Sequence, residues 1–243
     1  MQNFANIVYI VALFRKKAML WVIEISKIFE KKTENTNKTE KIYKNVRIIL
    51  RLHAKQDKIY CIQENNRGYI MEKIYETAYA KINLGLDVLG KRSDGYHEVR
   101  MVMQSVGLSD AVEIEEGEGL VVETDHSGLA GGPDNLAWKA AELLARCCGK
   151  IPNVHIRLNK KIFLAAGLAG GSSDAAAVMR GLSRLWQLDL TAPELEKLAA
   201  ELGSDIPFCI TGGTALAEGR GEILTELPEA PELLLVWQSR SLK

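Results

Sequence analysis

Hydrophobic and polar residues alternate along positions 74–88 of the chain. A repeat of two residues is typical of a β-strand with one buried face, so this pattern predicts a long strand. The glycines and polar residues of 90–95 predict a connecting turn, and renewed alternation over 99–104 predicts the return strand. The folded part of the chain is therefore expected to open with a long hairpin.

Later segments carry apolar residues at helical spacing. Residues 134–148 and 175–186 each show such a stripe, and the first of them has a proline just before it and a glycine just after it. A third helix is expected to begin at Thr191, because Thr191 and Glu194 match a capping box. This helix is expected to end before Gly203.

Shorter apolar runs lie between and after these helices. Residues 154–158 alternate and predict a strand that leads into a Gly-rich loop. The runs 206–210 and 214–217 flank a Gly-Gly pair and predict a second hairpin. Antiparallel strand pairs separated by helices indicate an α+β fold rather than a doubly wound one.

Charge divides the chain into two parts. Residues 1–70 hold 14 of the 31 Lys and Arg residues and 6 of the 31 Asp and Glu residues, so this segment is basic and the remainder is acidic. All six prolines follow Met71. We therefore predict a basic N-terminal extension outside the fold at 1–70, a folded domain at 71–237 and a short tail at 238–243.

Composition also excludes several classes of partner. The folded part has more acidic than basic residues. This argues against nucleic-acid binding, which needs a basic surface. The uncharged run at 4–14 is shorter than a membrane span, which takes about 18 residues or more. The four cysteines match neither a disulfide framework nor a zinc pattern. We expect a cytoplasmic protein that binds a small-molecule substrate, without a nucleic-acid or membrane partner.

A Gly-rich loop at 165–175 runs directly into the predicted helix at 175–186. Glycine lets a backbone approach a ligand closely, and a helix start presents unpaired N–H groups and the positive end of the helix dipole. The loop therefore predicts an anion site, with a nucleotide phosphate as the first candidate. It lacks the lysine of a Walker A loop and lies too late for a dinucleotide fingerprint. The alternative is a tight turn whose small residues serve only packing.

Phosphoryl transfer at such a loop would need a cation from elsewhere in the chain. Lys81 is a candidate, because the strand pattern places it with Asn83 and Asp87 on the face opposite the apolar one. Asp205 follows a predicted helix and could accept the proton of a substrate hydroxyl. The alternatives are a solvated strand lysine and a turn aspartate.

Two flat side chains, Tyr96 and His97, follow the turn of the first predicted hairpin. They either stack on the base of a ligand or are turn and rim residues. His126 and His155 have no partners at the spacing of metal ligands. The residues themselves therefore predict no metal site.

Several motifs occur along the chain, and both the motifs and their order resemble those of a known family. They are Ala80–Leu84, Arg92–His97, Ala165–Ala176, Leu202–Phe208 and Ala217–Glu222. In this order the chain resembles the 4-diphosphocytidyl-2-C-methyl-D-erythritol kinases of the GHMP kinase superfamily. The resemblance runs from about Met71 to Val236. The loop alone would indicate only the superfamily.

The resemblance implies the fold of a GHMP kinase N-terminal domain, which is like domain 2 of ribosomal protein S5. It implies ATP-dependent phosphorylation of the 2-hydroxyl of 4-diphosphocytidyl-2-C-methyl-D-erythritol, a step of non-mevalonate isoprenoid biosynthesis. It also implies ATP and Mg²⁺ as cofactors. The alternatives are another GHMP small-molecule kinase or an inactive fragment of the kinase.

The resemblance also implies roles for individual residues. Lys81 and Asp205 would form the catalytic pair, and Mg²⁺ would lie near Ser173. Asn83, Tyr96 and His97 would bind the substrate, with the latter two on its cytosine. The residues implied to bind ATP are Phe163, Leu164, Ala165, Ala166, Gly167, Leu168, Ala169, Gly170, Gly171, Ser172, Ser173, Asn135 and Lys160.

The chain departs from the family pattern at two places. Phe163 stands where the family usually enters the loop through a proline. In addition, the family has a second domain with its own Gly-rich loop, and residues 238–243 do not resemble its beginning. We therefore expect the second domain to be absent. Neither the oligomeric state nor the metal ligands follow from the sequence.

Overall fold

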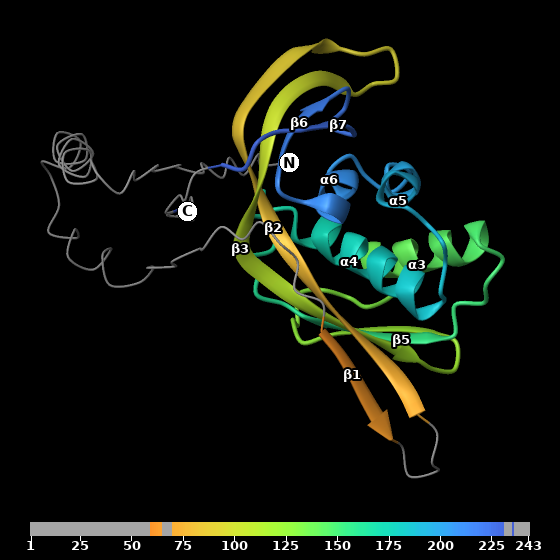
Figure 1. Cartoon of the computed structure of the whole chain (residues 1–243). Helices are drawn as coiled ribbons and strands as arrows, with labels where there is room; N and C mark the ends of the chain where they lie inside the picture. Colours follow the sequence, from red (N-terminus) through yellow and green to blue (C-terminus); the bar gives the residue numbers. More distant parts are fainter. Residues whose placement is uncertain (1–58, 65–69, 231–234, 236–243) are drawn as a thin grey trace, which may run out of the picture. The chain divides into compact units, whose positions relative to one another are not determined.

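The computed structural model describes residues 59–64, 70–230 and 235 (Figure 1). Residues 59–64 and 70–229 belong to one compact unit, which holds all the helices and strands that the structure describes. In chain order these are β1 Ile59–Glu64, β2 Ile70–Lys91, β3 His97–Glu116, β4 Leu120–Thr124, α3 Leu136–Cys147, β5 Val154–Asn159, α4 Gly170–Leu185, α5 Ala192–Ala199, α6 Ile206–Thr211, β6 Thr214–Glu218 and β7 Ile223–Glu226.

A seven-stranded sheet forms the frame of this unit. Its strands run in the order β1-β2-β3-β5-β4, and β6 pairs with both β3 and β7. Paired strands are antiparallel, except for β4 and β5, which are parallel. Figure 1 shows helices α3 to α6 gathered on one side of the sheet. This arrangement is an α+β fold and confirms the predicted fold class.

The main core lies between the sheet and helix α4. Ile74 of β2 and Ile114 of β3 are fully buried there, in the same core cluster as the alanines at 175–177 of α4. A Cβ atom at Gly181 would lie 2.4 Å from Cδ1 of Ile114. Because Gly181 has no side chain, α4 can lie close against the sheet. The close packing fixes the middle of α4 relative to β2 and β3.

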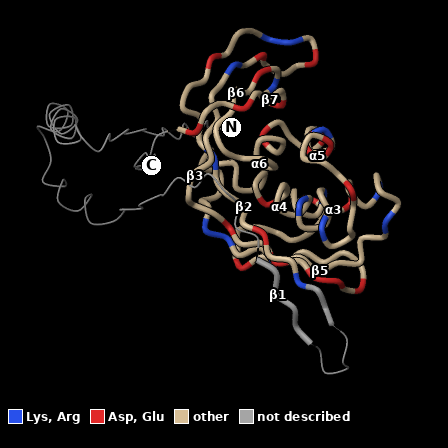
Figure 2. The backbone as a smooth tube through the Cα atoms, in the orientation of Figure 1, with Lys and Arg blue, Asp and Glu red and all other residues tan. Residues whose placement is uncertain are grey.

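The opposite face of β2, β3 and β5 carries ion pairs, as the alternating pattern requires. Lys73 lies 2.8 Å from Glu113 and 2.9 Å from Glu115, and Arg157 lies within 2.8 Å of both carboxylates. Figure 2 shows these strands with acidic and basic positions side by side. Partly exposed pairs of this kind contribute about 0–1 kcal/mol each, so they keep this face polar more than they hold the fold together.

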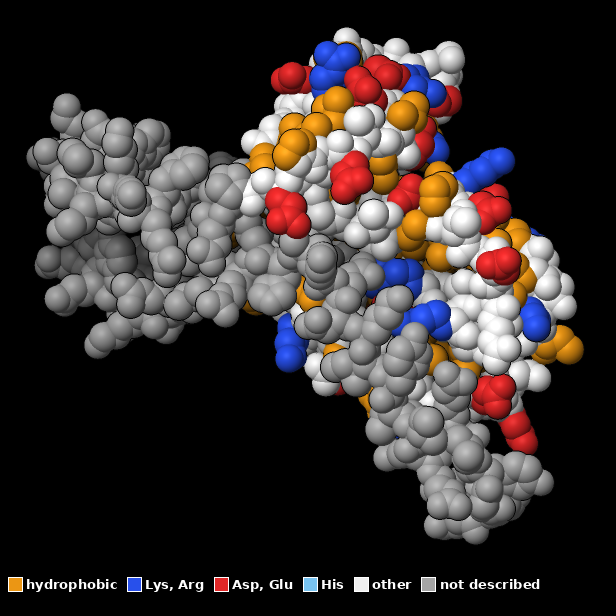
Figure 3. All heavy atoms as spheres, in the orientation of Figure 1, with side chains coloured by type: hydrophobic (Ala, Val, Ile, Leu, Met, Phe, Trp, Pro, Cys, Tyr) orange, Lys and Arg blue, Asp and Glu red, His pale blue; other side chains and the backbone are white. Residues whose placement is uncertain are grey.

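Beyond residue 85, β2 and β3 continue as a hairpin arm. Leu86, Val88 and Leu89 of this arm are more than half exposed, at 52%, 61% and 55%. Figure 3 shows hydrophobic side chains at the surface in the part of the unit where Figure 1 places the arm. The arm carries the turn that precedes Tyr96 and His97.

Most of the elements predicted from periodicity are confirmed. The hairpin of β2 and β3, the strand β5 and the helices α3, α4 and α5 all form, and Thr191 and Glu194 make the predicted capping box. The predicted strand at 206–210 is wrong, because these residues form helix α6. A short apolar run does not distinguish a strand from a buried helix, and Pro207 at the start of the run favours a helix. Strand β6 pairs instead with β3 and β7.

The described sheet begins upstream of the boundary predicted at Met71. Strand β1 pairs with the start of β2, and Ile70 is the first residue of β2, so seven residues of the segment predicted to lie outside the fold belong to the sheet. The rest of that segment lies outside the described residues, as does the predicted tail at 238–243. None of the helices that the structure describes is long and apolar enough to cross a membrane.

Candidate active site

The Gly-rich loop connects β5 to α4 and adopts an unusual backbone. Ala165, Gly167 and Ala169 all have positive φ angles, of 53°, 75° and 58°. Positive φ is strained for alanine, and such strain gathers at functional sites. Helix α4 starts at Gly170, earlier than the position predicted, and the first N–H groups of a helix lack intrahelical partners. The loop and the helix start therefore present backbone N–H groups that could bind an anion, and the anion site stays a prediction.

The middle of the loop is joined to strand β2. The N–H of Lys81 donates a hydrogen bond of 3.1 Å to the carbonyl oxygen of Leu168. Ala166 and Leu168 are buried, whereas Phe163 and Leu164 are exposed. The loop is thus fixed on its inner side and open on its outer side.

Lys81 is buried, and it contacts two of the residues singled out with it. Its Nζ atom lies 3.2 Å from Oδ2 of Asp205 and 3.0 Å from Oδ1 of Asn83. The strand pattern predicts Lys81 on the polar face, and this is wrong. The register between β2 and β3 shifts between Tyr79 and Lys81. The irregularity interrupts the alternation, so Ala80 and Lys81 are both buried.

Asp205 is the N-terminal flanking residue of α6, and its side chain is 34% exposed. Arg180 of α4 holds the other end of α6. Its guanidinium donates to the carbonyl oxygens of Cys209 at 2.7 Å, Ile210 at 3.3 Å and Thr77 at 3.0 Å. Burial lowers the pKa of Arg180 to about 10, so the side chain stays charged at neutral pH. Arg180 thus joins α6 to α4 and β2 beneath the aspartate.

Ser173 is buried and does not face the outside of the loop. Its hydroxyl donates to the carbonyl oxygen of Tyr79 at 2.6 Å and lies 3.4 Å from Sγ of Cys209. The expectation that Mg²⁺ lies near this hydroxyl finds no support in that geometry. Ser172, one residue earlier in α4, is half-exposed. Among the described residues, no group of three or more His, Cys, Asp or Glu side chains could hold a metal ion.

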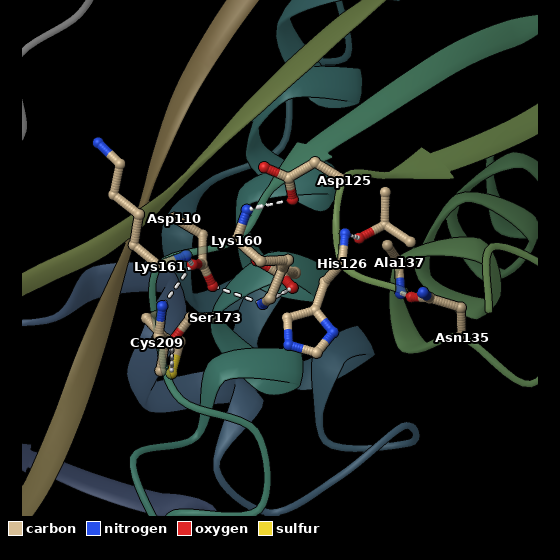
Figure 4. A network of polar contacts seen from close by, with 12 residues as sticks. Asp110, Asp125, His126, Asn135, Ala137, Lys160, Lys161, Ser173 and Cys209 are labelled. Carbon is tan, nitrogen blue, oxygen red and sulfur yellow. Dashed lines mark hydrogen bonds and ion pairs between the residues drawn. The ribbon is translucent and has the colours of Figure 1, made fainter. Parts of the chain in front are cut away.

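Asn135 and Lys160 both point their polar atoms into the protein (Figure 4). Asn135 caps helix α3, because its Oδ1 accepts the N–H of Ala137 at 2.9 Å. The ammonium of Lys160 is 1% exposed and bonds to Asp110 and Asp174. The predicted contacts of these two side chains with adenosine stay predictions. The sequence assigns no role to Asp110, because its partners lie about 50 residues further along the chain.

Asp174 provides a test through the pH dependence of stability. Burial, followed by the charge of Asp110, raises the pKa of Asp174 to about 7, while Lys160 opposes the shift. The folded protein therefore holds a proton that the unfolded chain releases near pH 4. We expect this group to lower the Tm as the pH rises from about 4 to about 7. Differential scanning fluorimetry should show this fall, and Asp174→Asn should flatten it. An equal fall in the variant would assign the pH dependence to other groups.

Tyr96 and His97 lie exposed at the start of β3, and a cation accompanies the first of them. The Cζ atom of Arg220 lies 4.9 Å from the centroid of the Tyr96 ring, a cation–π distance. Arg220 is on the turn between β6 and β7, inside the Ala217–Glu222 motif. The sequence assigns no role to this arginine, because its contact with Tyr96 joins segments far apart in the chain.

The turn of Arg220 also links this group to the aspartate. Gly219 accepts the N–H of Val99 at 2.8 Å. A Cβ atom at Gly221 would lie 3.7 Å from the Cβ of Ser204, which directly precedes Asp205. The turn therefore spans the gap between the arm and the start of α6. The candidate site combines a helix start that follows a Gly-rich loop, a lysine–aspartate pair and an aromatic group with a guanidinium.

Comparison with known proteins places this fold and these motifs in context. Residues 135–213 match the family described as GHMP kinases N terminal domain. The 4-diphosphocytidyl-2-C-methyl-D-erythritol kinase of Caldanaerobacter subterraneus subsp. tengcongensis is 50% identical over 165 residues, which cover 68% of this chain and 58% of the relative. The kinase of the same name from Synechococcus sp. (strain JA-3-3Ab) is 54% identical over 153 residues, 63% of this chain and 50% of the relative.

A solved structure agrees with these relatives. A crystal structure of 4-(cytidine 5'-diphospho)-2C-methyl-D-erythritol kinase is 38% identical, with a TM-score of 0.54, and covers 63% of this chain and 55% of that one. The chain spans about half the length of the curated relatives it matches. The similarity therefore concerns the described unit and one part of those proteins.

Proposed function

Because the chain contains a GHMP kinase N-terminal domain, we propose that it carries the ATP-binding and hydroxyl-activating part of a kinase. The proposed reaction transfers the γ-phosphoryl group of ATP to the 2-hydroxyl of 4-diphosphocytidyl-2-C-methyl-D-erythritol. The observation that supports this most directly is the Lys81–Asp205 pair, at 3.2 Å, beside a loop whose N–H groups can bind phosphate. A cytoplasmic location and a small-molecule substrate stay predictions.

Asp205 is proposed to orient the substrate hydroxyl and take its proton as the oxygen attacks the γ-phosphorus. The bond to the β-phosphate oxygen breaks, and ADP leaves. Lys81 holds the carboxylate in place through its ammonium and offsets the negative charge that develops on the transferred group. The contact of Lys81 with Asn83 extends the pair toward the substrate, where Asn83 can hydrogen-bond a second hydroxyl.

The loop and the start of α4 are proposed to cradle the ATP phosphates, through backbone N–H groups near Gly170 and Gly171. Mg²⁺ is proposed to arrive with ATP, because Mg²⁺ in such sites is held largely by phosphate oxygens and one or two side chains. No group of three or more His, Cys, Asp or Glu side chains among the described residues could hold the ion by itself, so most of its ligands would be phosphate and water oxygens. Bound there, the ion would neutralise charge on the transferred phosphoryl group.

Tyr96 and His97 are proposed to hold the cytosine base, and Arg220 its diphosphate. A guanidinium over the Tyr96 ring, 4.9 Å from its centroid, suits a ligand that combines a flat base with phosphate. A second candidate function is phosphorylation of another small alcohol by a GHMP kinase. The Tyr96–Arg220 contact favours the cytidine nucleotide, because a simple alcohol would need neither group.

Transfer of labelled phosphate from ATP to the cytidylated alcohol tests the proposed function. The measurement uses the chain of 243 residues, with CDP as competitor. Phosphorylation that CDP inhibits would support the proposal. Phosphorylation of a different alcohol without inhibition by CDP would support the second function. Binding of both ligands without turnover would support the alternative of an inactive fragment.

Replacing Arg220 tests the proposed diphosphate contact. We expect Arg220→Met to weaken CDP binding about tenfold to a hundredfold, because a hydrogen bond to a charged group contributes about 1.5–3 kcal/mol. Binding of cytidine should change little, since the base still meets Tyr96. Isothermal titration calorimetry measures both affinities. Arg100→Met is a matched control on the neighbouring strand, where the arginine pairs with Glu218; equal losses in both variants would contradict the assignment.

A further inference from the structure

Three charged side chains lie buried beneath the Gly-rich loop. Asp110 comes from β3, Lys160 follows β5 and Asp174 lies near the start of α4. Their side chains are 0%, 1% and 2% exposed. The ammonium of Lys160 lies between the two carboxylates and bonds to both, and Figure 4 shows it directed at Asp110. We refer to these three residues as the buried triad.

The triad holds the chain on both sides of the loop. On the entry side, Oδ1 of Asp110 accepts the backbone N–H groups of Lys161 and Ile162, the latter at 2.8 Å. On the exit side, Asp174 belongs to α4 itself and bonds to Lys160. The two ends of the loop are therefore joined through one ammonium ion and two carboxylates.

Hydrophobic packing alone could hold the loop without the free-energy cost of removing charged groups from water. Buried ion pairs lose much of their Coulombic gain to desolvation, and apolar residues of similar volume are often as stable. Here two carboxylates share one ammonium, and Oδ1 of Asp174 has no hydrogen-bond partner among the described residues. The loop between them keeps Ala165 and Ala169 at positive φ, a strain that persists only where surrounding contacts impose it.

We propose that Asp110, Lys160 and Asp174 are positioning residues, which hold the Gly-rich loop and the first turn of α4 in the arrangement that binds a triphosphate. The inference rests on the proposed function only in taking the anion to be ATP. The triad acts through the backbone and does not touch the reacting atoms. It fixes where the N–H groups of Gly170 and Gly171 point, so the phosphate site is formed before ligand arrives.

The charge of the buried triad should also affect the pH dependence of ATP binding. The charged groups that face Asp174 are Lys160, after β5, and Asp110, on β3. Because Asp174 ionises as the pH rises through about 7, it adds negative charge near the start of α4. That charge opposes the binding of a polyphosphate. Binding of ATP by the unaltered protein should therefore weaken with rising pH relative to a variant that cannot ionise there.

The first experiment compares ATP, AMP and tripolyphosphate as ligands of the whole chain by calorimetry. We expect Lys160→Met and Asp110→Asn to weaken ATP and tripolyphosphate about tenfold or more, and AMP less than about twofold. Asp189→Asn, on an exposed residue, is the matched control and should change nothing. Variants that fold and bind all three ligands like the unaltered protein would overturn the inference.

The second experiment uses Asp174→Asn, which keeps the shape of the side chain and therefore has the best prospect of folding. We expect the ratio of the ATP Kd of the unaltered protein to that of this variant to rise between about pH 6 and about pH 8. The ionisation of ATP itself is common to both proteins and cancels in the ratio. A constant ratio would overturn the role of Asp174. Binding of ATP without phosphorylation of the cytidylated alcohol would contradict the proposed function and leave this inference standing.

Discussion

Asp205→Asn is expected to reduce phosphoryl transfer about 10²- to 10⁴-fold, the contribution typical of a positioned general base. Asparagine keeps the size of the side chain and can still accept a hydrogen bond, but it cannot take a proton from the substrate hydroxyl. The loop contacts Lys81 through a backbone hydrogen bond at Leu168, which does not involve Asp205. ATP affinity should therefore stay within about twofold. Rapid-quench measurement of transferred phosphate, with ATP binding measured in parallel, separates the two quantities.

Lys81→Met should give a loss of similar size, because it removes the ammonium 3.2 Å from the same carboxylate. The double variant should be little worse than either single one, since residues that act as a unit are not additive. Asp189→Asn and Lys139→Met change the same residue types at exposed positions and are matched controls. Turnover of the Asp205 or Lys81 variants equal to that of the controls would exclude the assigned roles.

Arg180→Met is expected to lower the free energy of unfolding by about 1–3 kcal/mol, the usual effect of leaving buried hydrogen-bonding groups unsatisfied, because Arg184 still pairs with Glu76 in this variant. Arg180 pairs with Glu76 at 3.2 Å, and the two side chains are 12% and 8% exposed. Its loss also leaves the carbonyl oxygens of Cys209 and Thr77 without this donor. Urea denaturation followed by circular dichroism measures the change.

Arg146→Met is the matched control for Arg180→Met, because Arg146 lies exposed in the last turn of α3. It should change stability by less than about 0.5 kcal/mol. We also expect Arg180→Met to impair turnover more than ATP binding, since Arg180 holds the helix that Asp205 begins. An effect on stability no larger than that of the control would show that α6 is held mainly by its apolar side chains.

The regular elements could be predicted because their signals are local. The alternation of β2 follows from one buried face, and the capping box of Thr191 and Glu194 depends on residues three positions apart. The prediction of a strand at 206–210 is wrong because it also depends only on local signals. Its apolar residues have no period of their own, and α6 forms because they pack against α4 and are tied to it by Arg180.

The sequence could predict which residues belong to the candidate site but not how they are arranged in space. Lys81, Asp205 and the loop were identified from motifs, yet the burial of Lys81 depends on a register shift between two strands. Ser173 is buried for a different reason. Helix α4 starts earlier than its pattern predicts, and this turns the Ser173 hydroxyl into the protein. Asp110 and Arg220 contact the site from distant segments, and no local pattern indicates such contacts.

The sequence by itself determined the α+β class, the order of most helices and strands, and the position of a Gly-rich loop before a helix. These depend on the repeat of apolar residues and on the freedom of glycine, which act over a few positions. Only the tertiary structure decided that Lys81 is buried against Asp205, that Lys160 joins two aspartates beneath the loop, and that Arg220 lies over Tyr96. Such contacts join charges from separate segments, and their energies depend on a burial that exists only after the sheet and helices have packed.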